Sequence, residues 1–217
     1  MFLGTHMKSS LLALLVLLMP LSGFAQQSFQ AGTHYAVIET PVRTRNVEKI
    51  EVVELFWYGC GHCYTFEPII NQWKKSIAED VDFYRSPAMW GGPMELHARA
   101  FYAAKALKVL DKVHTPLFLT LNVERKKLNT PEAIADLFVD YGVEREKTLK
   151  ALSSFGILSQ VRQADARMRS YKVSGTPEVV VNGKYRVSAK MAGGQAEMIK
   201  VLNFLIEQER AAMTAAE

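Results

Sequence analysis

The sequence predicts an α/β fold in which an all-helical insertion separates two groups of strands. Three observations support this prediction. An apolar, β-branched run at 50–57 leads into a helical pattern, only helical patterns occur over 92–170, and strand signals with a hairpin return after residue 171. With 217 residues, 49% of them hydrophobic, the chain can bury a substantial core.

Residues 1–25 differ from the rest of the chain and have the features of a cleavable secretory signal peptide. Lys8 gives a positive start, the run 11–19 is apolar, and Ala25 offers a cleavage point, with Gly23 as an alternative. An uncleaved membrane anchor is the competing interpretation, but the apolar run is too short to span a bilayer. We therefore expect an exported protein.

The charge balance excludes some classes of partner. Lys and Arg total 26 against 22 Asp and Glu, which gives a net charge of +4. This excess is too small to indicate nucleic-acid binding, and the short basic run 125–127 is typical of an exposed helix end. The composition fits a soluble globular protein.

The first part of the α/β domain is expected at 26–91. IEVVELFW at 50–57 is rich in apolar and β-branched residues and predicts a buried central strand. From Cys60 onward, apolar residues recur three and four positions apart, which predicts a helix. A second short strand is expected at 81–84, closed by a nearby Ser-Pro pair.

The middle of the chain, 92–170, is expected to form the helical insertion. Thr130 followed by Pro131 is typical of a helix start, because threonine caps the first turn and proline is favoured at the first helical position. Helices are expected at 94–110, 133–141, 145–152 and 158–171.

The second part of the α/β domain is expected at 171–217. EVVV at 178–181 is followed by an Asn-Gly pair at 182–183, which readily forms the type I′ turn of a hairpin. The second hairpin strand is expected at 184–187 and a final helix at 195–209.

Cys60 and Cys63 are the two cysteines of the chain, and their spacing raises three possibilities. A disulfide staple here would add little stability, because loop-closure stabilisation grows with loop length. A zinc site would need further ligands, but no second CxxC exists and His34, His97 and His114 are scattered and more typical of surfaces or helix faces. A redox centre is the interpretation that fits an exported chain.

The position of Cys60, where a strand gives way to a helix, has an electrostatic consequence. Unpaired N–H groups and the dipole at a helix N-terminus favour negative charge, so we expect a lowered pKa for the Cys60 thiol. His62 can add positive charge or a hydrogen bond to the same sulfur. A stabilised thiolate favours the reduced form, which makes the disulfide a stronger oxidant.

Cys63 and Glu54 complete the pattern. Cys63 lies one turn into the helix and is expected to be buried by Phe56, Phe66 and their neighbours. Alternation along the strand leaves two possibilities open for Glu54: a solvent-facing or edge position, or a buried acid that relays the proton of Cys63. Burial would raise the pKa of this carboxyl, which suits that task.

Several motifs taken together resemble the DsbA family of periplasmic thiol:disulfide oxidoreductases. They are FWYGCGHCYTFEP at 56–68, GTP at 175–177, VNGKY at 181–185 and the helical insertion between the two halves. The likeness extends from about Gly32 to the last helix. It implies a thioredoxin fold with an inserted all-helical domain.

The resemblance also implies a role for each of six residues. Cys60 would be the exposed nucleophile, and Cys63 the buried resolving cysteine. The others are the thiolate-stabilising His62, the buried acid Glu54, Thr176 with backbone hydrogen bonds to an extended substrate, and the cis-proline Pro177.

Two positions depart from the family pattern. Gly61 stands where the family usually has proline, which gives the Gly-His pair found in protein disulfide isomerases and leaves the oxidising strength open. Glu178 follows Pro177 and brings a charge near the substrate groove, where it can alter substrate choice.

By this resemblance the function is disulfide formation in unfolded or reduced exported proteins in the periplasm, performed by a monomer. We expect no organic cofactor, metal or nucleic acid, because the Cys60–Cys63 disulfide itself carries the electrons. The resemblance implies reoxidation by a quinone-linked inner-membrane partner of the DsbB type. The nearest rival is a disulfide isomerase or reductase, which the Gly-His pair favours, although 26–49 is too short for the dimerisation domain of such isomerases. A chaperone or metal-binding module is the alternative from another class.

Overall fold

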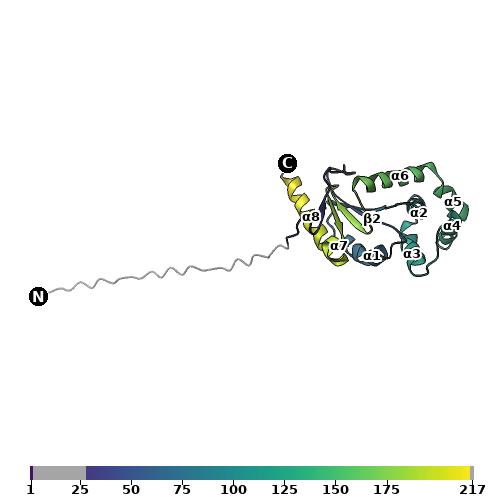
Figure 1. Ribbon diagram of the computed structural model, residues 1–217, viewed down its shortest axis with the longest axis horizontal. Helices are drawn as coiled ribbons and strands as arrows, with labels where there is room; N and C mark the ends of the chain where they lie inside the picture. The colour runs from purple at the N-terminus through teal and green to yellow at the C-terminus, as the bar shows by residue number, and fades with distance from the viewer. Residues whose placement is uncertain (2–27, 216–217) are drawn as a thin grey trace.

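The computed structural model describes Met1 and residues 28–215 (Figure 1). The expected signal peptide and its cleavage point after Ala25 lie outside the described residues, apart from Met1. The described chain runs from strands through a first helix, a further strand and five successive helices to a hairpin and two last helices. This order confirms the predicted α/β class with a helical insertion.

A five-stranded mixed sheet forms the centre of the α/β part, in the spatial order β1-β5-β4-β2-β3. The strands are β1 (Ala36–Val37), β2 (Ile50–Phe56), β3 (Val81–Pro87), β4 (Glu178–Val181) and β5 (Tyr185–Ser188). β3 runs parallel to β2, whereas the other neighbouring pairs are antiparallel. Every residue of β2 is buried, as expected for a central strand.

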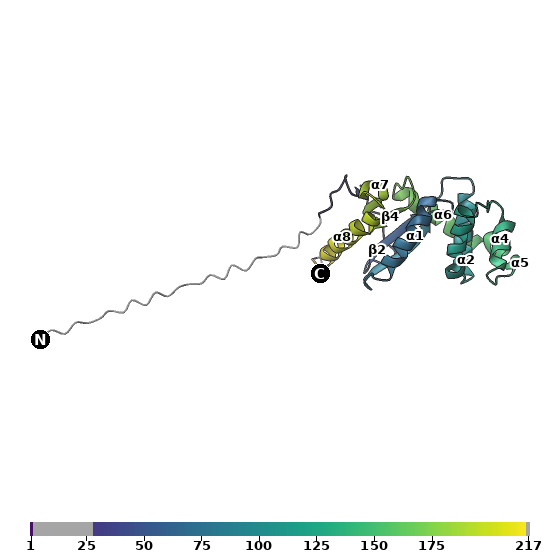
Figure 2. The same cartoon turned by 90° about the horizontal axis from the view of Figure 1, so that it is seen from below.

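Helices cover both faces of the sheet and form a separate layer at one end (Figures 1 and 2). They are α1 (Gly61–Lys74), α2 (Met94–Ala106), α3 (Leu110–Asn122), α4 (Pro131–Val139), α5 (Arg145–Leu152), α6 (Phe155–Ser170), α7 (Ala189–Ala192) and α8 (Gln195–Thr214). In Figure 1, α6 lies above the sheet and α1 and α7 below it, while α4 and α5 lie at the end away from α8.

Alternating residues of β2 serve different cores on the two faces of the sheet. Val52 packs in a cluster with Ile70 of α1 and Leu205 of α8. Val53 packs in the opposite cluster with Met168 of α6. The strand is therefore packed on both faces, which fixes its register in the sheet.

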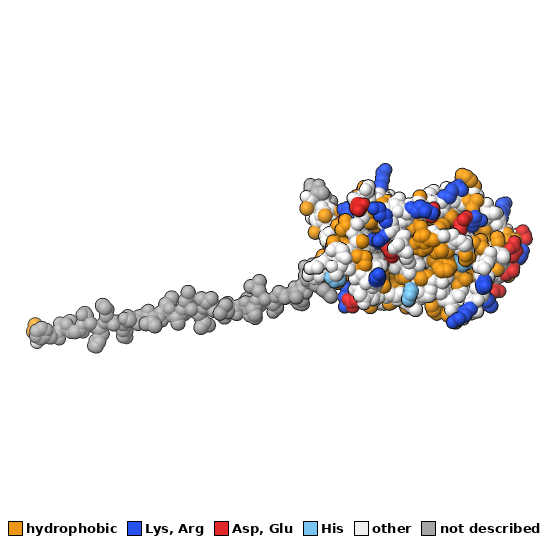
Figure 3. Space-filling view, in the orientation of Figure 1, with side chains coloured by type: hydrophobic (Ala, Val, Ile, Leu, Met, Phe, Trp, Pro, Cys, Tyr) orange, Lys and Arg blue, Asp and Glu red, His pale blue; other side chains and the backbone are white. Residues whose placement is uncertain are grey.

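A third apolar cluster lies where β2 and α1 meet the helical insertion. It contains Phe56 at the end of β2, Cys63 in α1, Phe118 in α3 and Phe138 in α4, all with no exposed surface. The insertion thus packs directly against the second cysteine. Figure 3 shows a further group of hydrophobic side chains on the surface of the molecule that faces the viewer in Figure 1, with Lys and Arg side chains around it.

Local sequence signals account for several boundaries. The hydroxyl of Thr130 accepts a hydrogen bond from the N–H of Ala133 at 3.2 Å, and Pro131 is the first residue of α4, as predicted. Asn182 and Gly183 have φ angles of 50° and 63°. Both values are positive, as the predicted type I′ turn requires.

The helix predicted at 94–110 ends earlier, and the helix that follows it was not predicted as a separate element. α2 ends at Ala106, and α3 occupies Leu110–Asn122. Lys108 between them has a φ of 59°, in the left-handed region. Neither glycine nor proline marks this break, so the residue pattern did not reveal it.

Other elements extend past their predicted limits. The strand predicted at 81–84 continues to Pro87, because β3 stays paired with β2 to its last residue. α6 begins at Phe155 rather than 158, since the hydroxyl of Ser154 caps it. β1 and α7 were not predicted, and they are too short to produce a periodic pattern. Within 28–215, no helix has both the length and the apolar character needed to cross a membrane.

Gly183 offers a test of the hairpin. A Cβ at Gly183 would lie 2.0 Å from the carbonyl oxygen of Val42, and the φ of +63° disfavours a side chain. We expect Gly183→Ala to lower the free energy of unfolding by about 2 kcal/mol. The control is Gly156→Ala in α6, where a Cβ meets nothing within 4 Å and should stabilise the helix by about 0.5–1 kcal/mol. Denaturant unfolding measures both variants. A Gly183→Ala variant as stable as Gly156→Ala would contradict the close contact at the hairpin turn.

Candidate active site

The end of β2 delivers the chain to the start of α1 through a tight turn. A Cβ at Gly59 would lie 2.4 Å from the ring of Trp57, so this turn requires glycine. The Trp57 indole N–H donates to Nδ1 of His97 at 2.9 Å, which fixes the ring. Cys60 then follows as the N-cap of α1, with an extended backbone. The predicted placement of Cys60 at a helix start is confirmed.

Cys60 receives hydrogen bonds that favour its thiolate. The N–H of Cys63 donates to the Cys60 sulfur at 3.3 Å. The pKa of Cys60 is lowered to about 5, chiefly by the hydrogen bond from the Cys63 side chain and also by Thr176 and the backbone N–H groups of Cys63 and His62, while burial opposes the shift. His62 acts here through its backbone. A role for its exposed ring stays a prediction.

Cys63 has the opposite environment. Its side chain has no exposed surface and packs in the cluster that contains Phe56, whereas Phe66 belongs to the neighbouring cluster. Burial raises the pKa of the Cys63 thiol, and the adjacent Cys60 sulfur raises it further. The pair therefore combines one sulfur that ionises easily with one that holds its proton.

The loop before β4 lies directly against the first cysteine. Cys60 Sγ is 3.3 Å from the carbonyl oxygen of Thr176, although 116 positions separate them in the sequence. The peptide bond between Thr176 and Pro177 is cis, as the resemblance implies. The structure thus brings together Cys60, Cys63, Thr176 and Pro177 from two distant segments.

A groove of about 560 Å³ begins beside this loop. Its lining includes His62, Thr65, Thr176, Pro177, Lys190 and Gln195. The Gln195 amide donates to the carbonyl oxygen of His62 at 2.6 Å, and the Thr65 hydroxyl donates to the Gln195 side-chain oxygen at 3.2 Å. Gln195 therefore ties the start of α8 to the first turn of α1. No pattern in the sequence pointed to it.

Glu54 is a fully buried acid, which excludes the solvent-facing position, while its role as a proton relay stays a prediction. Its carboxylate pairs with Arg85, with Nε and Oε2 2.8 Å apart. Burial raises the pKa of Glu54 to about 7, the nearby Glu67 adds to the rise, and Arg85 limits it. Arg85 faces Glu54 in the pairing of β2 with β3, so the strand register would have revealed it.

A buried polar chain continues from this pair to the cysteine loop. Arg85 lies 3.2 Å from Glu67 of α1, and Glu67 lies 3.3 Å from Nε2 of His114. His114 Nδ1 shares a 2.7 Å hydrogen bond with the hydroxyl of Tyr58, just before the cysteines. The sequence gave one indication of this row of polar side chains: Glu67 lies one helical turn after Cys63, so both are on the same face of the helix.

The two histidines of the insertion are buried rather than on the surface. His97 and His114 are 2% and 8% exposed, so the expectation that these histidines lie on the protein surface was wrong. His97 Nε2 lies 3.0 Å from the carbonyl oxygen of Leu128. Both histidines thus take part in the packing of the insertion against the cysteine loop.

Gly61, the first departure from the family pattern, lies in open space. A Cβ there would meet only the Asn122 side-chain oxygen, at 3.9 Å. The Asn122 amide donates to the carbonyl oxygens of Tyr58 and Phe118 at 2.7 and 2.8 Å. Asn122 thus joins the end of α3 to the cysteine loop, and the fold tolerates a larger residue at 61.

Comparison with known proteins decides the family. The profile of the DSBA-like thioredoxin domain matches residues 71–205, which is more than half of the chain. This chain belongs to the DSBA-like family. The matched range begins after the cysteine pair, but similar whole proteins extend over that segment as well.

Among curated proteins, the thiol:disulfide interchange protein DsbA of Pseudomonas aeruginosa is 42% identical over 208 residues, 95% of this chain and 99% of that protein. DsbA of Azotobacter vinelandii is 45% identical over 181 residues, 83% of this chain and 85% of that protein. The crystal structure of Pseudomonas aeruginosa DsbA matches with a TM-score of 0.83 and 44% identity, covering 86% of this chain and 97% of that one. The thioredoxin fold of this DSBA-like chain is thereby confirmed.

The low pKa of Cys60 predicts how pH and redox state together change stability. Because the folded-state pKa is lowered from 9.0 to about 5, the dithiol form gains stability that is complete above about pH 9 and lost as pH falls through about 5. The disulfide form has no thiol to ionise.

We therefore expect the free energy of unfolding of the reduced protein, relative to that of the oxidised protein, to rise between pH 5 and pH 9. Denaturant unfolding with and without a dithiol reductant at a series of pH values measures this difference. The reduced Cys60→Ser variant should lack the rise. A difference that is the same at pH 5 and pH 8 would contradict the lowered pKa.

Proposed function

We propose that Cys60 and Cys63 are the redox centre through which this protein introduces disulfide bonds into exported proteins. The chain is a thiol:disulfide oxidoreductase of the DSBA-like family, and its relatives are named for that activity. The observation that carries the assignment is the Cys60 sulfur at the head of α1, 3.3 Å from the Thr176 carbonyl oxygen. The cysteine pair supplies the redox chemistry, so the reaction needs no external cofactor.

The reaction transfers two electrons from the client to the enzyme. A client thiolate attacks Cys60 Sγ, the bond between Cys60 and Cys63 breaks, and a mixed disulfide forms between client and Cys60. Cys63 leaves as a thiolate and takes up a proton. A second client thiolate then attacks the client sulfur and expels Cys60 as a thiolate, which leaves an oxidised client and a reduced enzyme.

The environments of the two sulfurs favour this direction. The leaving group of the second step is the Cys60 thiolate, whose pKa is lowered to about 5. A low-pKa thiolate leaves readily, and its stability favours the reduced enzyme. Because Cys63 is buried, Cys60 is the sulfur open to a client. These features support an oxidant rather than a reductant.

We assign to Glu54 the proton that Cys63 takes up. The buried carboxyl has a pKa of about 7, so much of it is protonated at neutral pH and can donate. Glu54 pairs with Arg85, which also contacts Glu67 on the same helix as Cys63. We propose that this network supplies the proton to the buried sulfur of Cys63.

Client binding is assigned to Thr176, Pro177 and the groove beside them. An extended client segment can pair with the Thr176 backbone, as in strand addition to a sheet edge. The groove of about 560 Å³ continues from this point and offers room for the client residues that follow its cysteine. His62 lines the same groove and is assigned to stabilising the thiolate.

The remaining assignments concern place and partners. Client proteins are the substrates of this family, and we propose that this chain meets them in the periplasm after export by a signal peptide at 1–25. We further propose that it acts as a monomer and is reoxidised by a quinone-linked inner-membrane protein of the DsbB type. The α/β part is assigned to 26–91 and 171–217, with the helical insertion at 92–170.

The mechanism predicts different results for the two cysteine variants. Cys60→Ser should abolish oxidation of a reduced client, because the attacked sulfur is gone. A Cys63→Ser variant whose Cys60 is first activated as a mixed disulfide should form a lasting covalent complex with a client that has a single cysteine, visible by non-reducing electrophoresis, because neither Cys63 nor a second client thiol can release it. Wild-type protein that reshuffles a scrambled client but fails to oxidise a reduced one would instead identify an isomerase.

The role of Glu54 predicts a pH-dependent effect of Glu54→Gln. The ratio of the wild-type to the variant rate of mixed-disulfide formation should be largest below about pH 7, where Glu54 is protonated, and approach one above it. This ratio cancels the ionisation of the client thiol. Glu51→Gln is the matched control, since Glu51 is a buried acid on the same strand, bonded to Tyr171 instead. A ratio independent of pH would contradict the proton role.

A further inference from the structure

Glu178 is an acidic residue buried next to the candidate active site. It directly follows Pro177 as the first residue of β4, and only 4% of its surface is exposed. A carboxylate taken out of water must be paired or hydrogen-bonded to be tolerated. The partners of Glu178 therefore indicate why an acid stands at this position.

Glu178 has two partners, one on each carboxylate oxygen. Oε2 lies 3.0 Å from Nε of Arg186 on β5, and Oε1 accepts a hydrogen bond from the N–H of Ser174 at 3.3 Å. In the pairing of β4 with β5, Arg186 is opposite Val180, so Glu178 and Arg186 are diagonal neighbours on one face of the sheet. Burial raises the pKa of Glu178, and Arg186 opposes that rise.

These contacts brace the loop that faces Cys60. The loop runs from Ser174 to Pro177, and Glu178 at its end binds the N–H at its beginning. A Cβ at Gly175 would lie 3.9 Å from the same carboxylate oxygen, so the Glu178 side chain packs against the loop. In the same loop, the Thr176 carbonyl oxygen accepts a hydrogen bond from the Cys60 thiol at 3.3 Å.

We propose that Glu178, held in place by Arg186, is a positioning residue that fixes the loop 174–177 against Cys60. The inference rests on the proposed function, in which Cys60 is the attacked sulfur. Glu178 acts through its hydrogen bond and not through its charge, because Arg186 balances that charge. Among the groups that lower the pKa of Cys60, Cys63 and His62 belong to α1, whereas Thr176, which acts through a hydrogen bond from its side chain, belongs to the braced loop.

A charge swap separates the brace from the ion pair. The double variant Glu178→Arg/Arg186→Glu keeps opposite charges on the same two positions but leaves the N–H of Ser174 without an acceptor at 178. We expect the swap to unfold at a higher denaturant concentration than Glu178→Ala. We also expect its Cys60 pKa, measured by thiolate absorbance, to rise by about half a pH unit or more, roughly threefold in the dissociation constant.

Glu178→Gln provides the converse variant and does not depend on the swap folding. Its amide oxygen can still accept from the Ser174 N–H, but its neutral side chain leaves Arg186 uncompensated. We expect Glu178→Gln to keep the wild-type pKa of Cys60 and the wild-type rate of mixed-disulfide formation while losing stability. Glu178→Ala should raise the pKa of Cys60 and also lower the free energy of unfolding.

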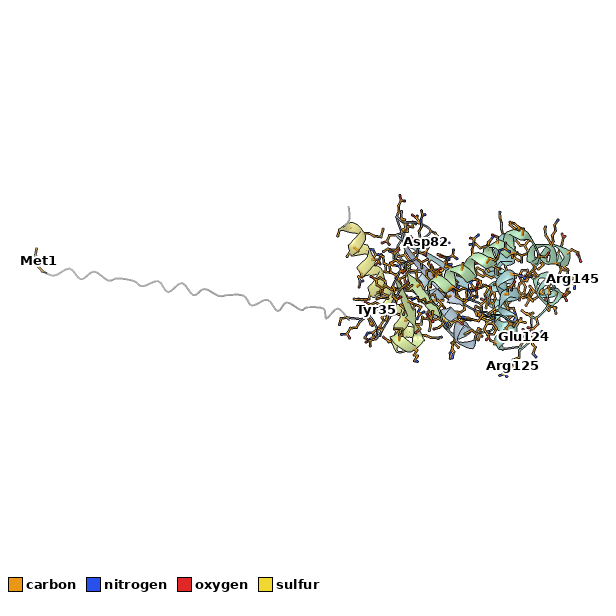
Figure 4. The ribbon with its side chains drawn as sticks, turned by 45° about the horizontal axis from the view of Figure 1, so that its top comes forward. Met1, Tyr35, Asp82, Glu124, Arg125 and Arg145 are labelled. Atoms are coloured by element: carbon orange, nitrogen blue, oxygen red, sulfur yellow. The ribbon has the colours of Figure 1, made fainter. Side chains whose placement is uncertain are left out.

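The matched control is a charge swap of an exposed ion pair far from the cysteines. Arg145 Nε lies 2.6 Å from Asp136 Oδ1, and both side chains are exposed. Figure 4 shows Arg145 at the helical end of the molecule, opposite Tyr35 at the sheet end. Asp136→Arg/Arg145→Asp should leave the Cys60 pKa and the exchange rate unchanged.

Two results would overturn the inference: a wild-type Cys60 pKa and exchange rate in Glu178→Ala, or equal pKa rises in Glu178→Gln and Glu178→Ala. The second result would assign the effect to charge. A wild-type protein without a lowered Cys60 pKa or oxidase activity would overturn the proposed function, and this inference with it.

Discussion

The pairing of Cys63 with the sulfur of Cys60, through the Cys63 thiol and the Cys63 N–H, is the contact on which the rest of the site depends. It exists because Cys60 caps α1, and Cys60 caps α1 because the buried strand β2 ends at Phe56 and the Gly59 turn leads directly into the helix. The same helix start carries Cys63 into the core. One local arrangement therefore exposes a stabilised thiolate and buries its partner.

Burial supplied by the helical insertion makes the two sulfurs different. Phe118 of α3 packs in the cluster that contains Cys63, and Asn122 at the end of α3 holds the carbonyl of Tyr58. β2 and β3 contribute the buried ion pair of Glu54 and Arg85, and Arg85 also contacts Glu67 on the helix that carries Cys63. The insertion thus belongs to the candidate active site, since its side chains pack in the cluster that buries Cys63.

Residues whose effect is local were predictable from the sequence, and those that depend on register or long-range packing were not. Thr130 and the Asn182–Gly183 turn act within a few positions, and the structure has both as predicted. The break at Lys108 carries no glycine or proline signal. Burial of Glu54 was left open because alternation assumes one wet face, whereas β2 is covered on both. Arg85, His114 and Gln195 come from elements whose neighbours only the fold defines.

The most direct test of this account is a titration of the reduced protein followed by thiolate absorbance. The account predicts a single step with a midpoint near pH 5, which the Cys60→Ser variant lacks. A midpoint near 9, the value of an ordinary thiol, would show that the start of α1 does not stabilise the Cys60 sulfur and would contradict the central claim.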